Sequence, residues 1–216
     1  MLKAIIFDFD GVICESVEVK TDAFRRLFKG YPEHLDEIVA FHMQNGGMSR
    51  FRKFEIIYKD ILKKPLTEAQ SKHLGEKFTE YSYQAVLDSD FVVGASEFLK
   101  KNYKKYLLFV VSGTPEDEMI RVVNARGLDR YFKAVYGSPR LKHDLIGEIM
   151  GKYHLKPYEV IFVGDSTTDQ EGARKSGVDF IGRVHARYPS PFGELSKKNI
   201  INDINGLELL LSKRAI

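Results

Sequence analysis

The sequence of 216 residues predicts an α/β fold, in which a parallel sheet carries a helical unit inserted after its first strand. Three observations support this fold. Short apolar runs alternate with helical segments, each run ends in small polar or acidic residues, and a long interval between the first two runs has a helical pattern. A chain of this length, 44% hydrophobic and 29% charged, can bury one substantial core and a smaller second one.

Three apolar runs are the expected strands. They cover residues 4–7, 107–111 and 160–163, with the sequences AIIF, LLFVV and VIFV. Each run is rich in β-branched and aromatic residues and is too short for a helix. Runs that are apolar throughout are typical of strands buried on both faces, as in a parallel sheet covered by helices. A further strand is expected over 179–181.

Helices are expected after the second and third runs. Thr114 can cap a helix that has Pro115 in its first turn, and Gly127 is placed to end that helix. Residues 168–176 contain helix formers and precede a glycine, which predicts another helix. A last helix is expected over 203–211. The strand and helix order is that of a parallel α/β sheet.

Residues 15–90 separate the first two strands and have a helical pattern. Thr67 and Gln70 form a capping box at the start of one long helix. The interval is too long for a simple crossover connection, so we expect it to fold as a small domain of its own. The chain is therefore divided into a core of residues 1–14 and 91–216 and a helical cap of residues 15–90.

Charge and composition exclude several functions. The 33 Lys and Arg residues against 30 Asp and Glu give a net charge of +3, and the interval 15–90 is itself close to neutral, so nucleic-acid binding is not expected. The single cysteine, Cys14, excludes an intramolecular disulfide and a Cys-rich zinc site. No apolar stretch could span a membrane and the run after Met1 lacks signal-peptide features, so we expect a cytoplasmic protein without a membrane partner. The oligomeric state is left open.

The chemistry is expected where the three strands end. Asp8 and Asp10 follow the first strand, residues 112–114 follow the second, and Asp165 and Asp169 follow the third. In an open parallel sheet, ligands bind in the crevice beyond the carboxyl ends of the strands. Strand geometry also points residues i and i+2 to the same side, so Asp8 and Asp10 would face one space.

A cluster of four carboxylates needs a cation. Two unit charges about 4 Å apart repel by roughly 4 kcal/mol at an effective dielectric constant of about 20. An all-oxygen ligand set without histidine favours a hard cation, and Mg²⁺ fits best. The alternative is that these aspartates only cap helices and turns, which is easily true of any one of them. It is much less favoured for Asp8, Asp10, Asp165 and Asp169 together.

Four segments, taken in order, resemble the motifs of the haloacid dehalogenase superfamily. They are Asp8-Phe9-Asp10-Gly11-Val12, Ser112-Gly113-Thr114, Lys142, and Gly164-Asp165-Ser166-Thr167-Thr168-Asp169. The resemblance covers essentially the whole chain, and it implies a Rossmann-like sheet core with a helical cap inserted after the first strand. The sequence is most similar to capped members such as phosphoglycolate phosphatases and β-phosphoglucomutases.

The resemblance also implies how the reaction proceeds. Asp8 would attack phosphorus and form an aspartyl-phosphate, and Asp10 would act first as general acid and then as general base. Phosphate-ester chemistry is favoured over dehalogenation, because a halide leaving group needs no acid at position 10. We therefore expect a Mg²⁺-dependent phosphatase acting on a small phosphorylated metabolite. A phosphomutase of the β-phosphoglucomutase type and a non-catalytic binding protein on the same fold are the alternatives.

The remaining motif residues would bind phosphate and metal. The phosphoryl group would be held by Ser112, Gly113, Thr114 and Lys142, with backbone N–H groups near the following helix start contributing. Mg²⁺ would be held by Asp8, the Asp10 carbonyl and Asp165, with Asp169 bound directly or through water.

The cap should set the substrate, and its most site-like loop is residues 46–52. Its two glycines allow sharp turns, and Arg50 and Arg52 could bind a carboxylate or a second phosphate of the substrate. A plain surface loop is nearly as favoured for either arginine. A helical cap that closes over the strand ends would also restrict turnover to small substrates.

Overall fold

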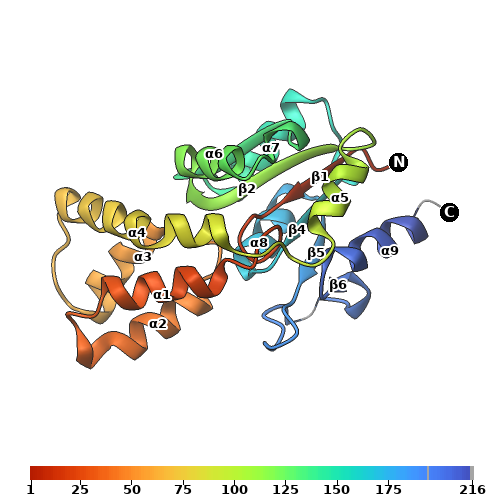
Figure 1. Ribbon diagram of the computed structural model, residues 1–216. Coiled ribbons are helices and arrows are strands. Elements are labelled where there is room, and N and C mark those ends of the chain that lie inside the picture. Colours follow the sequence, from red (N-terminus) through yellow and green to blue (C-terminus); the bar gives the residue numbers. More distant parts are fainter. Residues whose placement is uncertain (194, 215–216) are drawn as a thin grey trace.

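The structure is a computed structural model that describes residues 1–193 and 195–214 (Figure 1). Within these residues a parallel sheet has six strands in the order β3-β2-β1-β4-β5-β6. The strands are β1 (Ala4–Phe7), β2 (Leu107–Pro115), β3 (Ala134–Ser138), β4 (Val160–Gly164), β5 (Asp179–Arg183) and β6 (Ile200–Ile201). The four strands expected from the sequence are confirmed, and they are joined by β3 and β6 at the two edges.

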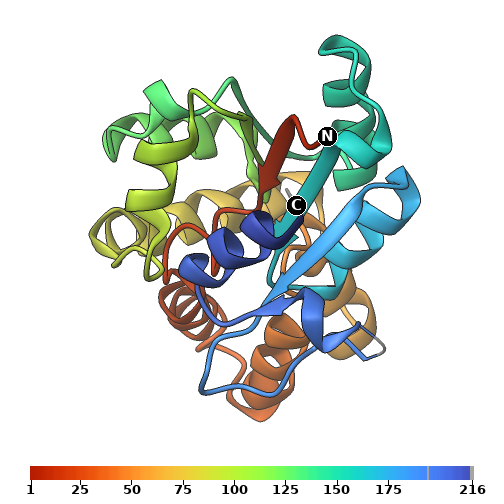
Figure 2. The same cartoon turned by 90° about the vertical axis from the view of Figure 1, so that its right-hand side faces the viewer.

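Helices cover both faces of this sheet (Figure 2). They are α5 (Ala95–Asn102), α6 (Glu116–Ala125), α7 (Lys142–Lys152), α8 (Thr167–Ser176) and α9 (Ile204–Arg214). Alternate residues of β1 point to opposite faces of the sheet. Ile5 and Phe7 pack in the cluster that includes residues of α5, α6 and α9, whereas Ile6 packs with residues of α7 and α8. No helix in the described part of the chain is long and apolar enough to cross a membrane.

The helix after β2 begins later than the sequence suggests. Thr114 does not cap α6 but continues β2, and Pro115 is paired with Ser138 of β3 and is itself the N-cap residue. A residue that precedes proline is disfavoured in the helical region, which keeps Thr114 extended. The expected end is confirmed, because α6 stops at Ala125 and Gly127 has a φ of +65°.

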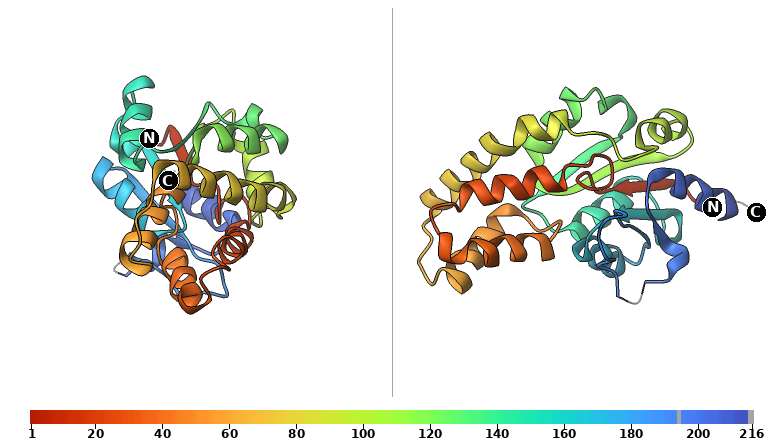
Figure 3. Two further views of the ribbon diagram at one scale, coloured as in Figure 1. Left: turned by 90° about the vertical axis from the view of Figure 1, so that its left-hand side faces the viewer. Right: turned by 60° about the horizontal axis from the view of Figure 1, so that its bottom comes forward.

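The helices of the interval 15–90 gather beyond the carboxyl ends of the strands (Figures 1 and 3). They are α1 (Val17–Leu27), α2 (Leu35–Gln44), α3 (Arg50–Ile56) and α4 (Glu68–Asp88), with a π-helical segment over Ile57–Ile61. The capping box of Thr67 and Gln70 is confirmed at the start of α4. These helices bury a hydrophobic cluster of their own, which includes Phe24, Phe54 and Phe78. The helical interval therefore has its own core and stands at the end of the sheet where the site is expected.

Candidate active site

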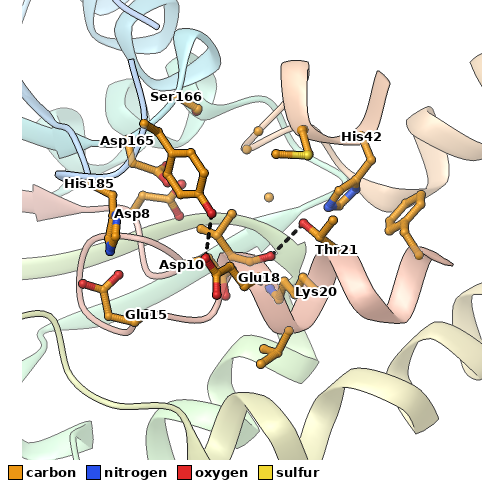
Figure 4. Close-up of a pocket in the computed structure, with 18 of the residues that line it drawn as sticks. Asp8, Asp10, Glu15, Glu18, Lys20, Thr21, His42, Asp165, Ser166 and His185 are labelled. Carbon is orange, nitrogen blue, oxygen red and sulfur yellow. Dashed lines mark hydrogen bonds and ion pairs between the residues drawn. The ribbon is translucent and has the colours of Figure 1, made fainter. Parts of the chain in front are cut away.

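Three aspartates meet at the carboxyl ends of β1 and β4 (Figure 4 labels two of them). One carboxylate oxygen each from Asp8, Asp165 and Asp169 lies within 4.8 Å of the others. Asp8 directly follows β1 and is 2% exposed, while Asp169 lies in the first turn of α8 and is fully buried. Asp169 is fixed by a capping box in which its Oδ2 accepts a hydrogen bond from the Ser166 N–H at 3.0 Å.

Lys142 supplies positive charge to this cluster. It is the first residue of α7, and its Nζ donates a hydrogen bond to Asp8 Oδ2 at 2.8 Å and another to Asp169 Oδ1. Burial disfavours the charged ammonium, but the Asp169 and Asp8 carboxylates raise the pKa of Lys142 above its ordinary value. The side chain is therefore a buried, charged ammonium that touches two of the three carboxylates.

Burial and mutual repulsion oppose ionisation of two of the three carboxyl groups. Burial raises the pKa of Asp8 to about 7, although Lys142 acts against this shift. Burial also raises the pKa of Asp165 well above its ordinary value, and the charges of Asp8 and Asp169 add to the effect. A hard divalent cation would stabilise the ionised forms of these groups, and carboxylate oxygens are the donors that such a cation prefers. The residues present therefore fit such a cation.

Asp10 faces the cap side of the site rather than the carboxylate cluster. Its Oδ2 accepts a hydrogen bond from Lys20 Nζ at 2.5 Å, and its Oδ1 accepts one from Ser16 Oγ at 2.6 Å. Burial favours a raised pKa for Asp10, but Lys20 and Ser16 together hold it below its ordinary value. Lys20 also donates to Thr114 Oγ1 at 2.7 Å. Asp10 is therefore held as a carboxylate at the point where the cap begins.

The backbone after Asp10 passes directly against Asp165. Gly11 has a φ of +73°, and a Cβ at this position would lie 2.8 Å from Asp165 Cγ. Only glycine allows both the left-handed conformation and this close approach. The Asp10-Gly11 peptide is consequently next to the carboxylate cluster.

The cap loop lies on the end of β2 and on the segment that follows β4. The Gly46 carbonyl accepts a hydrogen bond from Thr168 Oγ1 at 2.8 Å. Gly47 has a φ of +71°, and a Cβ there would lie 2.7 Å from Ser166 Oγ and 3.1 Å from Lys142 Nζ. A Cβ at Gly113 would in turn lie 2.8 Å from the Gly47 carbonyl carbon. Ser112 is buried beneath this contact, and its Oγ accepts the Thr114 N–H at 3.1 Å.

The two cap arginines differ in their surroundings. Arg50 donates to both carboxylate oxygens of Glu118, at 2.9 and 2.6 Å, and both side chains are buried. This ion pair connects α3 with α6, and Thr79 of α4 also donates to Glu118 at 2.7 Å. Arg52 is exposed, is paired with Glu55 and does not line the pocket. The structure brings Arg50 to the pocket wall but leaves Arg52 on the surface.

A pocket with a volume of about 950 Å³ lies between the carboxylates and the cap. Asp8, Asp10 and Asp165 line its sheet side, and residues of α1, α2 and the loop 46–50 line its cap side. The segment 183–191 borders it as well.

Several polar residues of this site are not identified by the sequence analysis. Ser16 and Lys20, which hold Asp10, stand one helical turn apart at the N-cap and in the first turns of α1, and this spacing is common on any solvated helix. Lys53 and His42 are buried on the cap side of the pocket. Lys53 stands beside Arg52 in a run that mixes charged and aromatic residues. From the sequence alone, its charged side chains would be placed on an exposed helix face, because the packing against α2 is not visible there. These residues can therefore be recognised as part of the site only from the packing of the folded chain.

Comparison with known proteins gives matches over most of the chain. A family model described as haloacid dehalogenase-like hydrolase matches residues 5–183. A phosphoglycolate phosphatase of Pasteurella multocida is 27% identical over 213 residues, covering 93% of this chain and 94% of that protein. A phosphorylated carbohydrates phosphatase of Thermotoga maritima is 23% identical over 191 residues, covering 86% and 87%. The crystal structure of a β-phosphoglucomutase from Clostridium difficile has a TM-score of 0.75 at 17% identity, covering 100% of this chain and 98% of that one.

Proposed function

This chain belongs to the haloacid dehalogenase-like hydrolase family and is a phosphoric monoester hydrolase, and from that premise we propose that it hydrolyses a small phosphorylated metabolite through an aspartyl-phosphate on Asp8, with Mg²⁺ as cofactor. The observation that carries the proposal is the contact of Lys142 with Asp8 and Asp169, next to a pocket that Asp8, Asp10 and Asp165 line. This arrangement supports a nucleophile, an acid–base group and a neighbouring ammonium at one site.

Asp8 is the proposed nucleophile. Its Oδ1 accepts the Phe9 N–H at 2.6 Å and its Oδ2 accepts Lys142, so the carboxylate is held in one orientation. Asp8 attacks phosphorus, a new oxygen–phosphorus bond forms, and the bond from phosphorus to the ester oxygen breaks. The leaving alcohol takes a proton from Asp10, which has to release Lys20 and take up that proton before this step. Splitting the displacement into two steps lowers the barrier of each.

Asp10 then acts as the base in the second step. It takes a proton from water as the water oxygen attacks phosphorus, and the bond between Asp8 and phosphorus breaks to release inorganic phosphate. The Lys20 ammonium and the Ser16 hydroxyl, which favour the ionised form of Asp10, suit this role. Both groups come from the start of the cap, so cap position and proton transfer are coupled.

The phosphoryl group and the cation are assigned to two neighbouring sets of residues. We assign phosphoryl binding to Ser112, Gly113, Thr114 and Lys142, where the buried ammonium offsets the charge that develops on the phosphoryl oxygens. Asp8, Asp165 and the Asp10 carbonyl would hold Mg²⁺, with Asp169 in contact directly or through water, and the cation bound there supplies further positive charge to the phosphoryl oxygens.

We further propose that residues 15–90 act as a cap domain over a catalytic core of residues 1–14 and 91–216. The separate hydrophobic cluster of these helices and the contact of the loop at Gly46 with Thr168 support this division. A closed cap excludes bulk water from the aspartyl-phosphate except for the water that reacts. The assignment of Arg50 and Arg52 to a second anion of the substrate stays a prediction, and Arg50 could act so only by leaving Glu118.

The substrate is proposed to be a small metabolite handled in the cytoplasm, without a nucleic-acid or membrane partner. Relatives named for phosphoglycolate and for phosphorylated carbohydrates support the size and class of the substrate. The pocket volume of about 950 Å³ suits a molecule of this size.

The proposal predicts that nitrophenyl phosphate is hydrolysed with Mg²⁺ and not after chelation. Asp8→Asn should lower kcat by more than about 1,000-fold, because the amide cannot attack phosphorus and is a poorer cation ligand. The control is Asp36→Asn on the exposed surface of α2, which makes the same chemical change away from the pocket and should leave kcat unchanged. Undiminished turnover by Asp8→Asn would show that another group is the nucleophile.

A further inference from the structure

Within the described residues, the buried cations of the pocket wall differ in whether they are paired with a carboxylate. Among the buried or half-buried lysines and arginines that line the pocket in the described part of the chain, Lys53 makes no ion pair with a carboxylate, although its side chain is only 4% exposed. The paired cations are Lys20 with Asp10, Arg50 with Glu118 and Arg183 with Glu15. A buried ammonium without an anion is costly, so its presence beside a pocket calls for an explanation.

The hydrogen bonds of Lys53 leave one donor free. Its Nζ lies 3.0 Å from the His42 carbonyl oxygen and 3.2 Å from His42 Nδ1. An ammonium group has three hydrogens, and the described residues provide acceptors for two of them. Burial, with the nearby charge of Lys53, lowers the pKa of His42 to about 2, so its ring is neutral. With Nδ1 as acceptor, the hydrogen of the ring is on Nε2, which is a second donor on this wall.

The position of the pair is also suitable for contact with a substrate. Lys53 comes from α3 and His42 from α2, and both line the pocket whose opposite side holds Asp8 and Asp10. Figure 4 shows His42 across the pocket from these aspartates. Burial and the charge of Lys20 lower the pKa of Lys53 to about 7, and the charges of Asp165 and Asp10 act against this shift without cancelling it. An anion brought next to Lys53 would therefore restore the stability of its charged form.

A purely structural role explains these features less well. The Lys53 ammonium lies 5.6 Å from the centroid of the Phe24 ring, within the hydrophobic cluster of the cap. A methionine would fill the same space without the cost of burying a charge. The charge of Lys53 therefore has a function only if an anionic group bound in the pocket pairs with it.

We propose that Lys53 and His42 form a subsite for a second anionic group of the substrate, a carboxylate or a phosphate, at the end remote from the phosphate ester that Asp8 attacks. The inference rests on the proposed function and adds the substrate class, namely small phosphate monoesters with an anionic tail. It also assigns binding of the second anion to Lys53 rather than to Arg50, whose guanidinium is already paired with Glu118.

The test compares three esters in wild type, Lys53→Met and the control Lys59→Met. The control removes an exposed lysine from the helical segment that follows α3. The esters are phosphoglycolate, a hexose bisphosphate and nitrophenyl phosphate, whose tail carries no full anionic charge. Lys53→Met should lower kcat/KM for an ester with an anionic tail by about 10- to 100-fold, as expected for a lost charge-assisted hydrogen bond, and leave nitrophenyl phosphate within about twofold. Lys53→Arg should keep part of the preference, and Lys59→Met should keep all of it.

The outcomes separate the subsite from the proposed function. A loss for phosphoglycolate alone assigns the subsite to carboxylates, and a loss for the bisphosphate alone assigns it to phosphates. Equal losses for all three esters, or none, would overturn the subsite while the phosphatase activity stands. If the wild type hydrolyses none of them, the proposed function fails and the subsite with it.

A measurement on the wild type alone covers the case in which Lys53→Met does not fold. Phosphoglycolate is compared with its glycolamide counterpart, which has the same shape and an uncharged tail. The subsite predicts a kcat/KM at least about 10-fold higher for the carboxylate. Equal values for the two esters would contradict it.

Discussion

At the scale of single residues, the site depends on one ammonium that contacts a cluster of three carboxyl groups. Lys142 touches the buried Asp8 and Asp169, and the half-buried Asp165 completes the cluster without an ion pair to a lysine or arginine in the described part of the chain. Asp10 has partners of its own, Ser16 at the N-cap of α1 and Lys20 within it. The carboxylates thus differ in their electrostatic surroundings, as expected if they have different tasks.

The raised pKa values predict how Mg²⁺ changes stability with pH. A carboxyl group whose pKa is higher in the folded than in the unfolded state favours folding when it is protonated. This contribution is complete below the unfolded pKa, near 4, and it is lost as the pH rises through the folded pKa, which is about 7 for Asp8. Burial raises the pKa of Asp165 in the same direction. Mg²⁺ binds the ionised forms and offsets the loss, so the increase in Tm on adding Mg²⁺ should be larger at about pH 8 than at about pH 5.5.

Thermal unfolding with and without Mg²⁺ across this pH range measures the effect. Asp36→Asn should behave as the wild type, and Asp8→Asn should lose most of the pH dependence of the Tm increase. An increase that is constant with pH, or larger under acidic conditions, would contradict the account.

At the scale of elements, two of the contacts between cap and core differ in kind. The loop between α2 and α3 lies on the end of β2 and on the segment after β4, where Gly46 accepts a hydrogen bond from Thr168. The buried Arg50–Glu118 pair connects α3 with α6 further from the carboxylates. The loop contact is made by backbone at glycines, which allows a close approach to Lys142 and Ser166.

Gly47→Ala tests whether this loop contact matters for turnover. The new Cβ would lie 3.1 Å from Lys142 Nζ and the residue would keep a positive φ, so the loop should close less well. We expect kcat/KM for phosphate esters to fall by about 10-fold, with only about 1 kcal/mol lost from the free energy of unfolding. Gly30→Ala is the control, because no atom lies within 4 Å of the added Cβ. Full activity of Gly47→Ala would mean that catalysis does not need this contact.

At the scale of the whole molecule, the sheet packs against a hydrophobic cluster on each face, and the cap helices bury a third cluster. The pocket lies between the elements that these clusters support. The proposed division of tasks predicts that substitutions on the cap side other than at Ser16 and Lys20 change substrate preference without changing the chemistry at Asp8.

The sequence predicts the sheet side of this arrangement better than the cap side. Strands such as β1 and β4 are apolar throughout, so their positions and the aspartates at their ends follow from local pattern alone. The edge strands β3 and β6 were missed because β3 is only partly buried and β6 has two residues. Lys53 could not be found in this way, because its burial depends on how α2 and α3 pack.

The central claim is that a phosphoryl group is transferred to Asp8. It is tested most directly by mixing the wild-type enzyme with Mg²⁺ and excess nitrophenyl phosphate, quenching in acid within the first turnovers, and locating the modified residue by peptide mass spectrometry. The account predicts a phosphoryl group on Asp8 that disappears when the substrate is exhausted and is absent from Asp8→Asn. A phosphoryl group on a different residue, or continued turnover with an unmodified Asp8 throughout, would contradict it.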